Sequence, residues 1–157
     1  MNVINRILKA HPDLLDELDS LLNIENVDIC KRKDGFNRVA LRLDAHETAE
    51  ERTLYAAMEQ DRQTKLLALQ SEEEHRIARN LVRELGETDP NDDIWLPRMV
   101  ILRNFVSLHM QIEENNVLPV ADRTLAPEDL DQLGNDFEIT EKTVLKEPIA
   151  QPSCPPE

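Results

Sequence analysis

Apolar residues recur at helical spacing in several long segments of the chain. In the first segment, from Ile4 to Leu22, apolar side chains and His11 fall every three or four residues, which places them on one face of an α-helix. Pro12 interrupts this segment. Because proline lacks a backbone amide donor, we expect a kink there or a new helix start just after His11. Further along, Lys33-Asp34-Gly35 is a turn signal that precedes the next segment.

The same period predicts three more helices. The second runs roughly over residues 36–60, and the third begins at about residue 64 and ends at Gly86, which provides a C-terminal stop. The fourth follows a polar loop at residues 88–93 and ends before Pro119, because proline cannot continue a helix interior.

These segments predict the fold class. Only 3 glycines and five aromatic residues argue against a turn-rich β fold, and long helices with short connections predict an all-α, antiparallel up-down four-helix bundle. Ala126-Pro127 marks the start of a short fifth helix. We expect residues 1–146 to form one bundle domain and the proline-rich segment 147–157 to be a disordered tail.

Charge and targeting features limit the classes of partner. The chain carries 18 basic and 32 acidic side chains, a formal charge of −14, which disfavours a nucleic-acid partner because such a partner needs a basic face. The beginning of the chain lacks a signal-peptide pattern, and no segment is apolar enough to span a membrane. Cys30 and Cys154 show no metal-ligand spacing, and we expect no structural disulfide. A cytoplasmic location is therefore predicted, with no membrane partner.

The candidate chemistry lies in the four histidines, each of which falls on the apolar face of a different predicted helix. Two of them are followed one turn later by a glutamate, in His46-x-x-x-Glu50 and His109-x-x-x-Glu113. Because residues four apart share a helix face, each pair can present an imidazole and a carboxylate to one interior point. A single histidine on an apolar face is more often a hydrogen-bonded core residue, and a single glutamate more often pairs with an arginine.

The order of these residues repeats, and this repeat favours a metal site over ordinary core histidines. His11 and His46 are 35 residues apart, and His75 and His109 are 34 apart, so each helix pair supplies a lone histidine and then a His-x-x-x-Glu. This arrangement suits two metal ions bridged by carboxylates. Glutamates buried in an aliphatic core are costly unless cations meet them. Imidazole with carboxylate is a ligand set for iron, manganese or zinc.

The ordered set resembles the hemerythrin-like, or HHE cation-binding, domain. The local sequences that carry this resemblance span about residues 4–137 and are LKAHPDLLDEL, AHETAEERTLYAAM, EEEHRIARNLVREL and LHMQIEENNVLPVADRTLAPEDLDQLG. The resemblance implies a non-haem site with two irons per chain. In such a site the terminal imidazole ligands would be His11, His46, His75 and His109, and the bridging carboxylates would be Glu50 and Glu113.

The ligand set departs from that of the oxygen-carrying hemerythrins, which use five histidines. This chain has four, which resembles members of the family in which an extra carboxylate completes the coordination. Glu47 is the best candidate for that role and Glu74 a weaker one. Fewer imidazoles and more carboxylates should stabilise ferric iron, so reversible O2 carriage is not expected. A ferritin-like site needs two Glu-x-x-His motifs, and only Glu72-x-x-His75 satisfies that pattern.

Three functions follow from the sequence. The first is a di-iron protein that binds or reacts with O2, peroxide or NO, in sensing, scavenging or iron handling. The second is a metal-dependent iron or redox sensor without catalysis, and the third is a metal-free helical interaction module. The chain shows no nucleophile–base pair, phosphate loop or nucleotide fingerprint, so a classical enzyme is not predicted. No protein partner is indicated.

Overall fold

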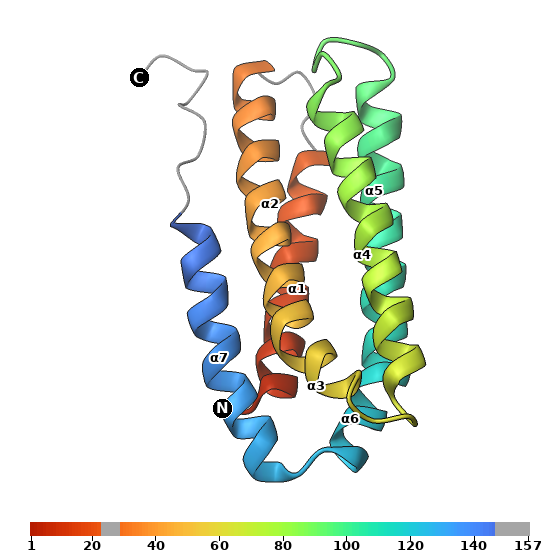
Figure 1. Ribbon diagram of the computed structural model, residues 1–157. Coiled ribbons are helices and arrows are strands. Elements are labelled where there is room, and N and C mark those ends of the chain that lie inside the picture. Colours follow the sequence, from red (N-terminus) through yellow and green to blue (C-terminus); the bar gives the residue numbers. More distant parts are fainter. Residues whose placement is uncertain (23–28, 147–157) are drawn as a thin grey trace.

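A computed structural model describes residues 1–22 and 29–146 of the chain, and all regular structure in these residues is helical, which confirms the predicted all-α class (Figure 1). Four long helices lie side by side, since α1 contacts α2 and α5, and α4 contacts the same two helices. Their bounds are Val3–Leu22 for α1, Ile29–Glu50 for α2, Lys65–Gly86 for α4 and Trp95–Ile112 for α5.

The bundle core is divided into two apolar clusters along its length. The first cluster includes Ile7, Tyr55 and Phe137, and the second includes Leu14, Leu43 and Trp95. On α1 the first cluster ends at Ile7 and the second begins at Leu14, with His11 between them. On α2 and α4 a histidine likewise lies between residues of the two clusters, so a layer of histidines separates two apolar regions. The fold thereby surrounds polar groups with apolar ones.

Two π-helical turns interrupt the helices that carry His-x-x-x-Glu. The turn η1, Glu51–Tyr55, follows Glu50 and leads into α3, Ala56–Met58, while η2, Glu113–Val117, begins at the second glutamate and leads into α6, Leu118–Thr124. The predicted helix end before Pro119 is therefore wrong. Pro119 is tolerated because it falls in the first turn of α6, directly after the π turn.

The last helix is longer than the short one predicted. It is α7, Pro127–Leu145, and it packs against α1 and α2 (Figure 1). Gly134 allows this close approach, because a Cβ atom at that position would lie 2.3 Å from the carbonyl oxygen of Met1 and 2.9 Å from the backbone nitrogen of Val3. A helix outside the four-helix frame is thus held tightly against the beginning of α1.

One local prediction on α2 is wrong, and on α1 the structure excludes a new helix start after His11. Lys33, Asp34 and Gly35 lie inside α2 and form no turn. Gly35 instead makes room for Leu21, whose Cδ2 atom would lie 2.8 Å from an added Cβ. Pro12 does not divide the first segment, since α1 continues through it from Val3 to Leu22. The predicted start and end of the third helix, near residue 64 and at Gly86, are confirmed.

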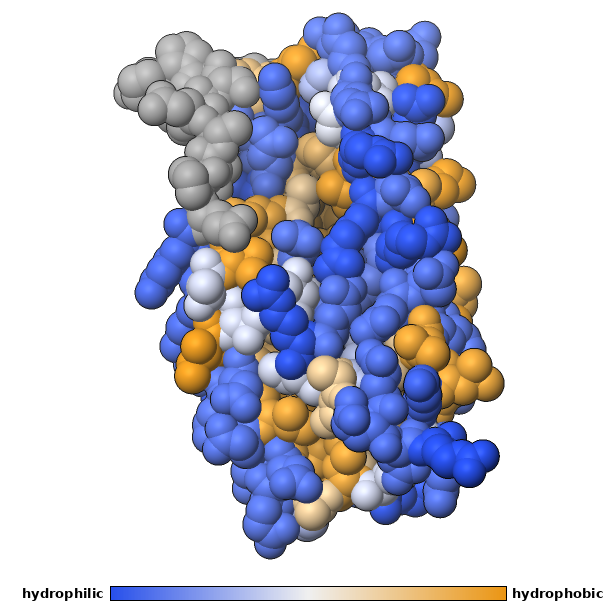
Figure 2. Space-filling model, in the orientation of Figure 1, coloured by the Kyte–Doolittle hydropathy of each residue, from blue (hydrophilic) through white to orange (hydrophobic). Residues whose placement is uncertain are grey.

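The surface and the cysteines bear on the remaining predictions from the sequence. The face shown in Figure 2 is mostly hydrophilic, with apolar side chains along the edge where α4 and α5 lie. Within the described residues, no helix is both long and apolar enough to cross a bilayer. The expectation of no structural disulfide concerns Cys30 and Cys154, and Cys154 lies outside the described residues. The predicted tail, residues 147–157, lies outside the described residues.

The contact at Gly134 gives a prediction about stability. Replacing Gly134 with alanine should destabilise the protein by about 2 kcal/mol, because the new methyl group meets rigid backbone, and should lower the Tm by about 4–8 °C for a chain of this size. The matched control is Gly86→Ala, whose Cβ would make an ordinary 3.7 Å contact with Phe36. Thermal unfolding followed by circular dichroism measures both. Equal Tm values for the two variants would contradict the close packing of α7.

Candidate metal centre

The four histidines and the two predicted bridging glutamates converge in one buried layer of the bundle. His11 comes from α1, His46 from α2, His75 from α4 and His109 from α5. Each of the four histidines is at most 7% exposed, and Glu50 and Glu113 are fully buried. The helical period therefore brings all six residues to the same interior, as their spacing predicts.

Glu50 lies at the centre of this layer, between two pairs of histidines. Its Oε1 atom is 2.8 Å from His46 Nε2 and 3.8 Å from His11 Nε2, and its Oε2 atom is 3.3 Å from His75 Nε2. His11, His46 and Glu50 can form one metal-binding group, and Glu50, His75 and His109 a second, with the ligand atoms of each group within 4.8 Å of one another. Each oxygen of Glu50 thus faces a different group, as predicted for a bridging carboxylate.

Glu113 approaches the layer from the other π turn. Its Oε2 atom lies 3.2 Å from His11 Nε2, and its Oε1 atom accepts a 2.7 Å hydrogen bond from the Tyr55 hydroxyl. Tyr55 is fully buried and its ring lies against that of His75. Sequence reasoning missed Tyr55, although a buried tyrosine needs a polar partner for its hydroxyl. Its role here is to fix the orientation of Glu113.

Unpaired polar atoms show that these residues fit bound metal ions. Within the described part of the chain, a group of buried side-chain atoms that face this layer has no hydrogen-bond partner, namely His11 Nε2, both ring nitrogens of His46, both oxygens of Glu50, and Glu113 Oε2. The Nε2 atoms of His75 and His109 face each other at 3.0 Å. Such buried groups are costly unless something satisfies them. Cations between the Nε2 atoms and the carboxylates would satisfy all of these atoms except His46 Nδ1, which lies on the other side of its ring.

A second ring of carboxylates contacts three of the imidazoles from behind. His75 Nδ1 lies 2.9 Å from Glu51, His109 Nδ1 lies 2.6 Å from Glu74, and His11 Nδ1 lies 2.7 Å from Glu114. A carboxylate that accepts the Nδ1 proton leaves the Nε2 lone pair free for a metal and fixes the ring orientation. Sequence reasoning missed Glu51 and Glu114. The signal was present, because both motifs read His-x-x-x-Glu-Glu.

The two candidates for an extra ligand lie differently. Glu74 contacts His109 from behind, as described above. Glu47 is 2% exposed and its Oε2 atom is 3.5 Å from Arg79 Nε. Among the described residues, neither metal-binding group includes Glu47, and its ligation stays a prediction. Burial raises the pKa of Glu47 to about 8, although His75 and Arg79 act in the opposite direction.

Charges inside the layer balance one another in the metal-free protein. Burial opposes a charge on His11, but the nearby carboxylates of Glu113 and Glu50 outweigh it and raise its pKa to about 10. His75 behaves in the same way, because Glu50 and Glu51 raise its pKa to about 10 against the effect of burial. Burial also opposes ionisation of the Glu50 carboxyl group. The nearby His46, His11 and His75 outweigh burial and hold the pKa of Glu50 well below its usual range. Protonated imidazoles therefore occupy the electrostatic role of the cations.

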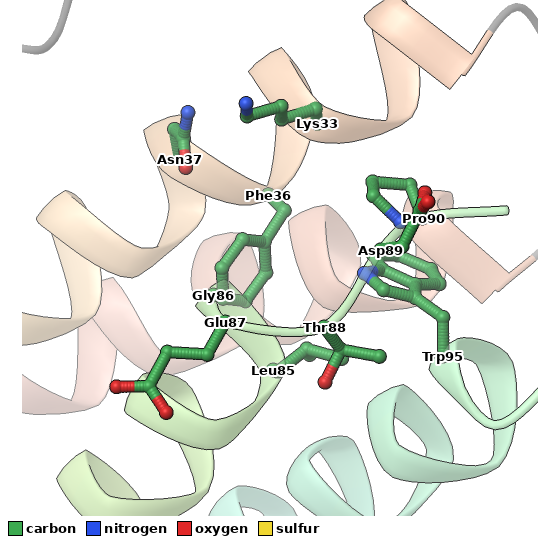
Figure 3. Close-up of a pocket in the computed structure, with 10 residues that line it drawn as sticks. All are labelled: Lys33, Phe36, Asn37, Leu85, Gly86, Glu87, Thr88, Asp89, Pro90 and Trp95. Atoms are coloured by element: carbon green, nitrogen blue, oxygen red, sulfur yellow. The ribbon is translucent and has the colours of Figure 1, made fainter. Parts of the chain in front are cut away.

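The layer formed by the four histidines, Glu50 and Glu113, named the metal layer below, is separate from a hollow at one end of the bundle. That hollow, of about 340 Å³, is lined by the start of α2, the end of α4 and the start of α5, and includes Phe36, Leu85 and Trp95 (Figure 3). Leu85 is ten residues beyond His75 on α4, a distance of about 15 Å along a helix. The hollow contains none of the six predicted ligands.

Comparison with known proteins assigns most of the bundle to one family. The model of the hemerythrin HHE cation-binding domain matches residues 2–121. The match covers the four long helices and all six predicted ligands, and it ends before α7. No curated protein and no solved structure matches the chain.

The charge balance gives a prediction about metal uptake. At pH 7 His11 and His75 are protonated in the metal-free protein, because their pKa values are about 10, and a metal binds only the neutral imidazole. Uptake of Co²⁺ should therefore release protons, and its affinity should rise by about tenfold per pH unit for each proton released, up to about pH 10. Calorimetric titration between pH 6 and 8, in two buffers with different ionisation enthalpies, counts these protons. Uptake without proton release would contradict this electrostatic description.

Proposed function

Because the chain belongs to the hemerythrin HHE cation-binding domain family, we propose that it is a non-haem di-iron protein that binds or reacts with O2, peroxide or NO. The observation that carries this proposal is the shared carboxylate of Glu50, whose two oxygens face different pairs of histidines. An antiparallel up-down order of the four long helices is part of the proposal, since it places ligands from four segments around one axis.

The ligand chemistry favours iron among the metals that imidazole and carboxylate bind. The six predicted ligands include no thiolate, and a closed structural zinc site is usually built with cysteine. Carboxylate-bridged pairs with imidazole ligands are typical of non-haem iron in helical bundles. Fewer imidazoles than in the oxygen carriers should favour ferric iron. We therefore propose sensing, scavenging or iron handling as the role, without reversible O2 carriage.

The residues of the chain would hold the metals and shield them. His11 and His46 would bind one iron and His75 and His109 the other, while Glu50 and Glu113 would bridge. The bound iron supplies the redox chemistry and the affinity for small ligands. The apolar clusters on both sides of the layer exclude bulk water, which favours a small uncharged ligand over a large or charged one.

A second candidate function is a metal-dependent iron or redox sensor without catalysis. The unpaired buried atoms of Glu50, Glu113 and His46 support it, because a fold that buries such groups is less stable without its metal. In this function the change in order of α1 would be the signal. The two candidates share the same ligands and differ in whether the centre reacts.

Metal analysis tests the proposed function. Protein produced with added iron should contain about two irons per chain, together with near-ultraviolet absorption of a ferric centre. Glu50→Ala should lose most of this iron, because both metal-binding groups include Glu50. The matched control is Glu73→Ala, which removes an exposed carboxylate paired with Arg76 and should retain full iron. Wild-type protein that stays free of iron would overturn the proposal.

Comparison of metal-free and metal-loaded protein tests the sensor candidate. Removal of the metal by a chelator should lower the Tm, because a ligand that binds only the folded state stabilises it. If the protein is a sensor, limited proteolysis should cut α1, residues 3–22, in the metal-free form alone. Identical digestion patterns in the two forms, with a lowered Tm, would reject the sensor and leave the di-iron centre intact.

A further inference from the structure

The metal layer has an internal two-fold repeat in the sequence. His46, Glu50 and Glu51 are each followed 63 residues later by an equivalent residue, at His109, Glu113 and Glu114, and His11 is followed 64 residues later by His75. In the structure, a glutamate of each half contacts a histidine of the other half. Glu51 of the first half contacts His75 of the second, and Glu114 of the second half contacts His11 of the first. Any departure from the repeat therefore makes the two metal positions unequal.

One such departure lies behind His46. Glu74, directly before His75, contacts Nδ1 of His109 at 2.6 Å. The equivalent residue in the first half, directly before His11, is Ala10. Ala10 has no carboxylate to offer, and Nδ1 of His46 has no hydrogen-bond partner among the described residues.

Phe137 of α7 occupies the space beside His46 instead. Its ring meets the imidazole edge-on, with the ring centroids 5.6 Å apart. Phe137 is buried, so an apolar ring lies against this imidazole, whereas His109 contacts the carboxylate of Glu74. Phe137 also lies beyond residues 2–121, which the family model matches. The difference between the surroundings of His46 and His109 thus depends in part on α7, which lies outside the residues that the family model matches.

From these contacts we infer that the two metal positions bind with different affinity, and that the position of His75 and His109 fills first. Both of its imidazoles have a carboxylate on Nδ1, from Glu51 and Glu74. The position of His11 and His46 has one, from Glu114. Such outer carboxylates orient the imidazole and add negative charge, and their loss typically weakens metal binding by about 10–100-fold. Glu50 does not cancel this difference, because one of its oxygens faces each group. Glu113 contacts His11 in this structure, and as a bridge of the proposed function it would serve both positions.

The inference rests on the proposed function, since it requires two metal positions, and it assigns Glu74 as a positioning residue. Glu74 does not face the metals itself. It acts through His109, and its counterpart would be a residue at position 10. The weaker position, at His11 and His46, is the one from which a metal would leave or exchange first.

Stepwise titration of the metal-free full chain with Co²⁺ tests this inference. The wild type should bind two ions in two resolved calorimetric steps, with affinities about 10–100-fold apart. Glu74→Gln should weaken the tighter step and bring the two steps together, whereas Glu73→Gln, on an exposed carboxylate, should change neither. Ala10→Glu should strengthen the weaker step. Tm values of the metal-free variants identify any that fail to fold.

The location of the first ion completes the test. A crystal of the full chain with one equivalent of Co²⁺ should show anomalous scattering between Glu50, His75 and His109. Two ions of equal affinity, unchanged by Glu74→Gln, or a first ion at His11 and His46, would overturn the inference and leave the two-metal function standing. Protein that binds no Co²⁺ and no iron would overturn the proposed function itself.

Discussion

The cost of burying ionisable groups is the constraint on which this structure depends. Two carboxylates and four imidazoles lie in a layer with apolar clusters on both sides. Water does not reach their inner atoms, and several of these atoms have no hydrogen-bond partner within the described residues. A carboxylate in such a place is stable only beside positive charge. In the metal-free protein that charge comes from protonated His11 and His75, whose pKa values are about 10. Protons and metal ions therefore compete for the same oxygens and nitrogens.

Helix geometry brings the ligands together, and departures from ideal helix geometry adjust their positions. A spacing of four residues puts His46 and Glu50, and likewise His109 and Glu113, on one face. Each glutamate adjoins a π turn, η1 or η2, and such turns are frequent at functional sites because one extra residue in the turn rotates the following face. In the first half that rotation buries Thr53, Leu54 and Tyr55 in succession, and the hydroxyl of Tyr55 can then reach Glu113. The π turn after Glu50 thus connects the two predicted bridging glutamates through Tyr55.

The sequence predicted the all-helical class and the convergence of six residues because both follow from the 3.6-residue period. It did not predict the π turns, since a single extra residue per turn leaves the local pattern almost unchanged. Glu51 and Glu114 were missed because a charged residue on a helix is solvated by default, and their contacts join segments far apart in the sequence. Gly35 was misinterpreted as part of a turn, although its small size serves contact with Leu21. Whether Glu47 binds metal could not be derived from spacing, because it depends on where Arg79 lies.

The symmetry of the layer and its departure at His46 have different origins. The repeat of His-x-x-x-Glu-Glu is a local pattern, and it forces the crosswise contacts once two helix pairs face each other. The departure at His46 needs two independent facts, an alanine at position 10 and a phenylalanine 91 residues beyond His46 on α7. Because Gly134 lets α7 approach the backbone at Met1 and Val3, that phenylalanine reaches the imidazole. The packing of a helix that contributes none of the predicted ligands therefore sets the surroundings of one imidazole, and with them the proposed difference between the two metal positions.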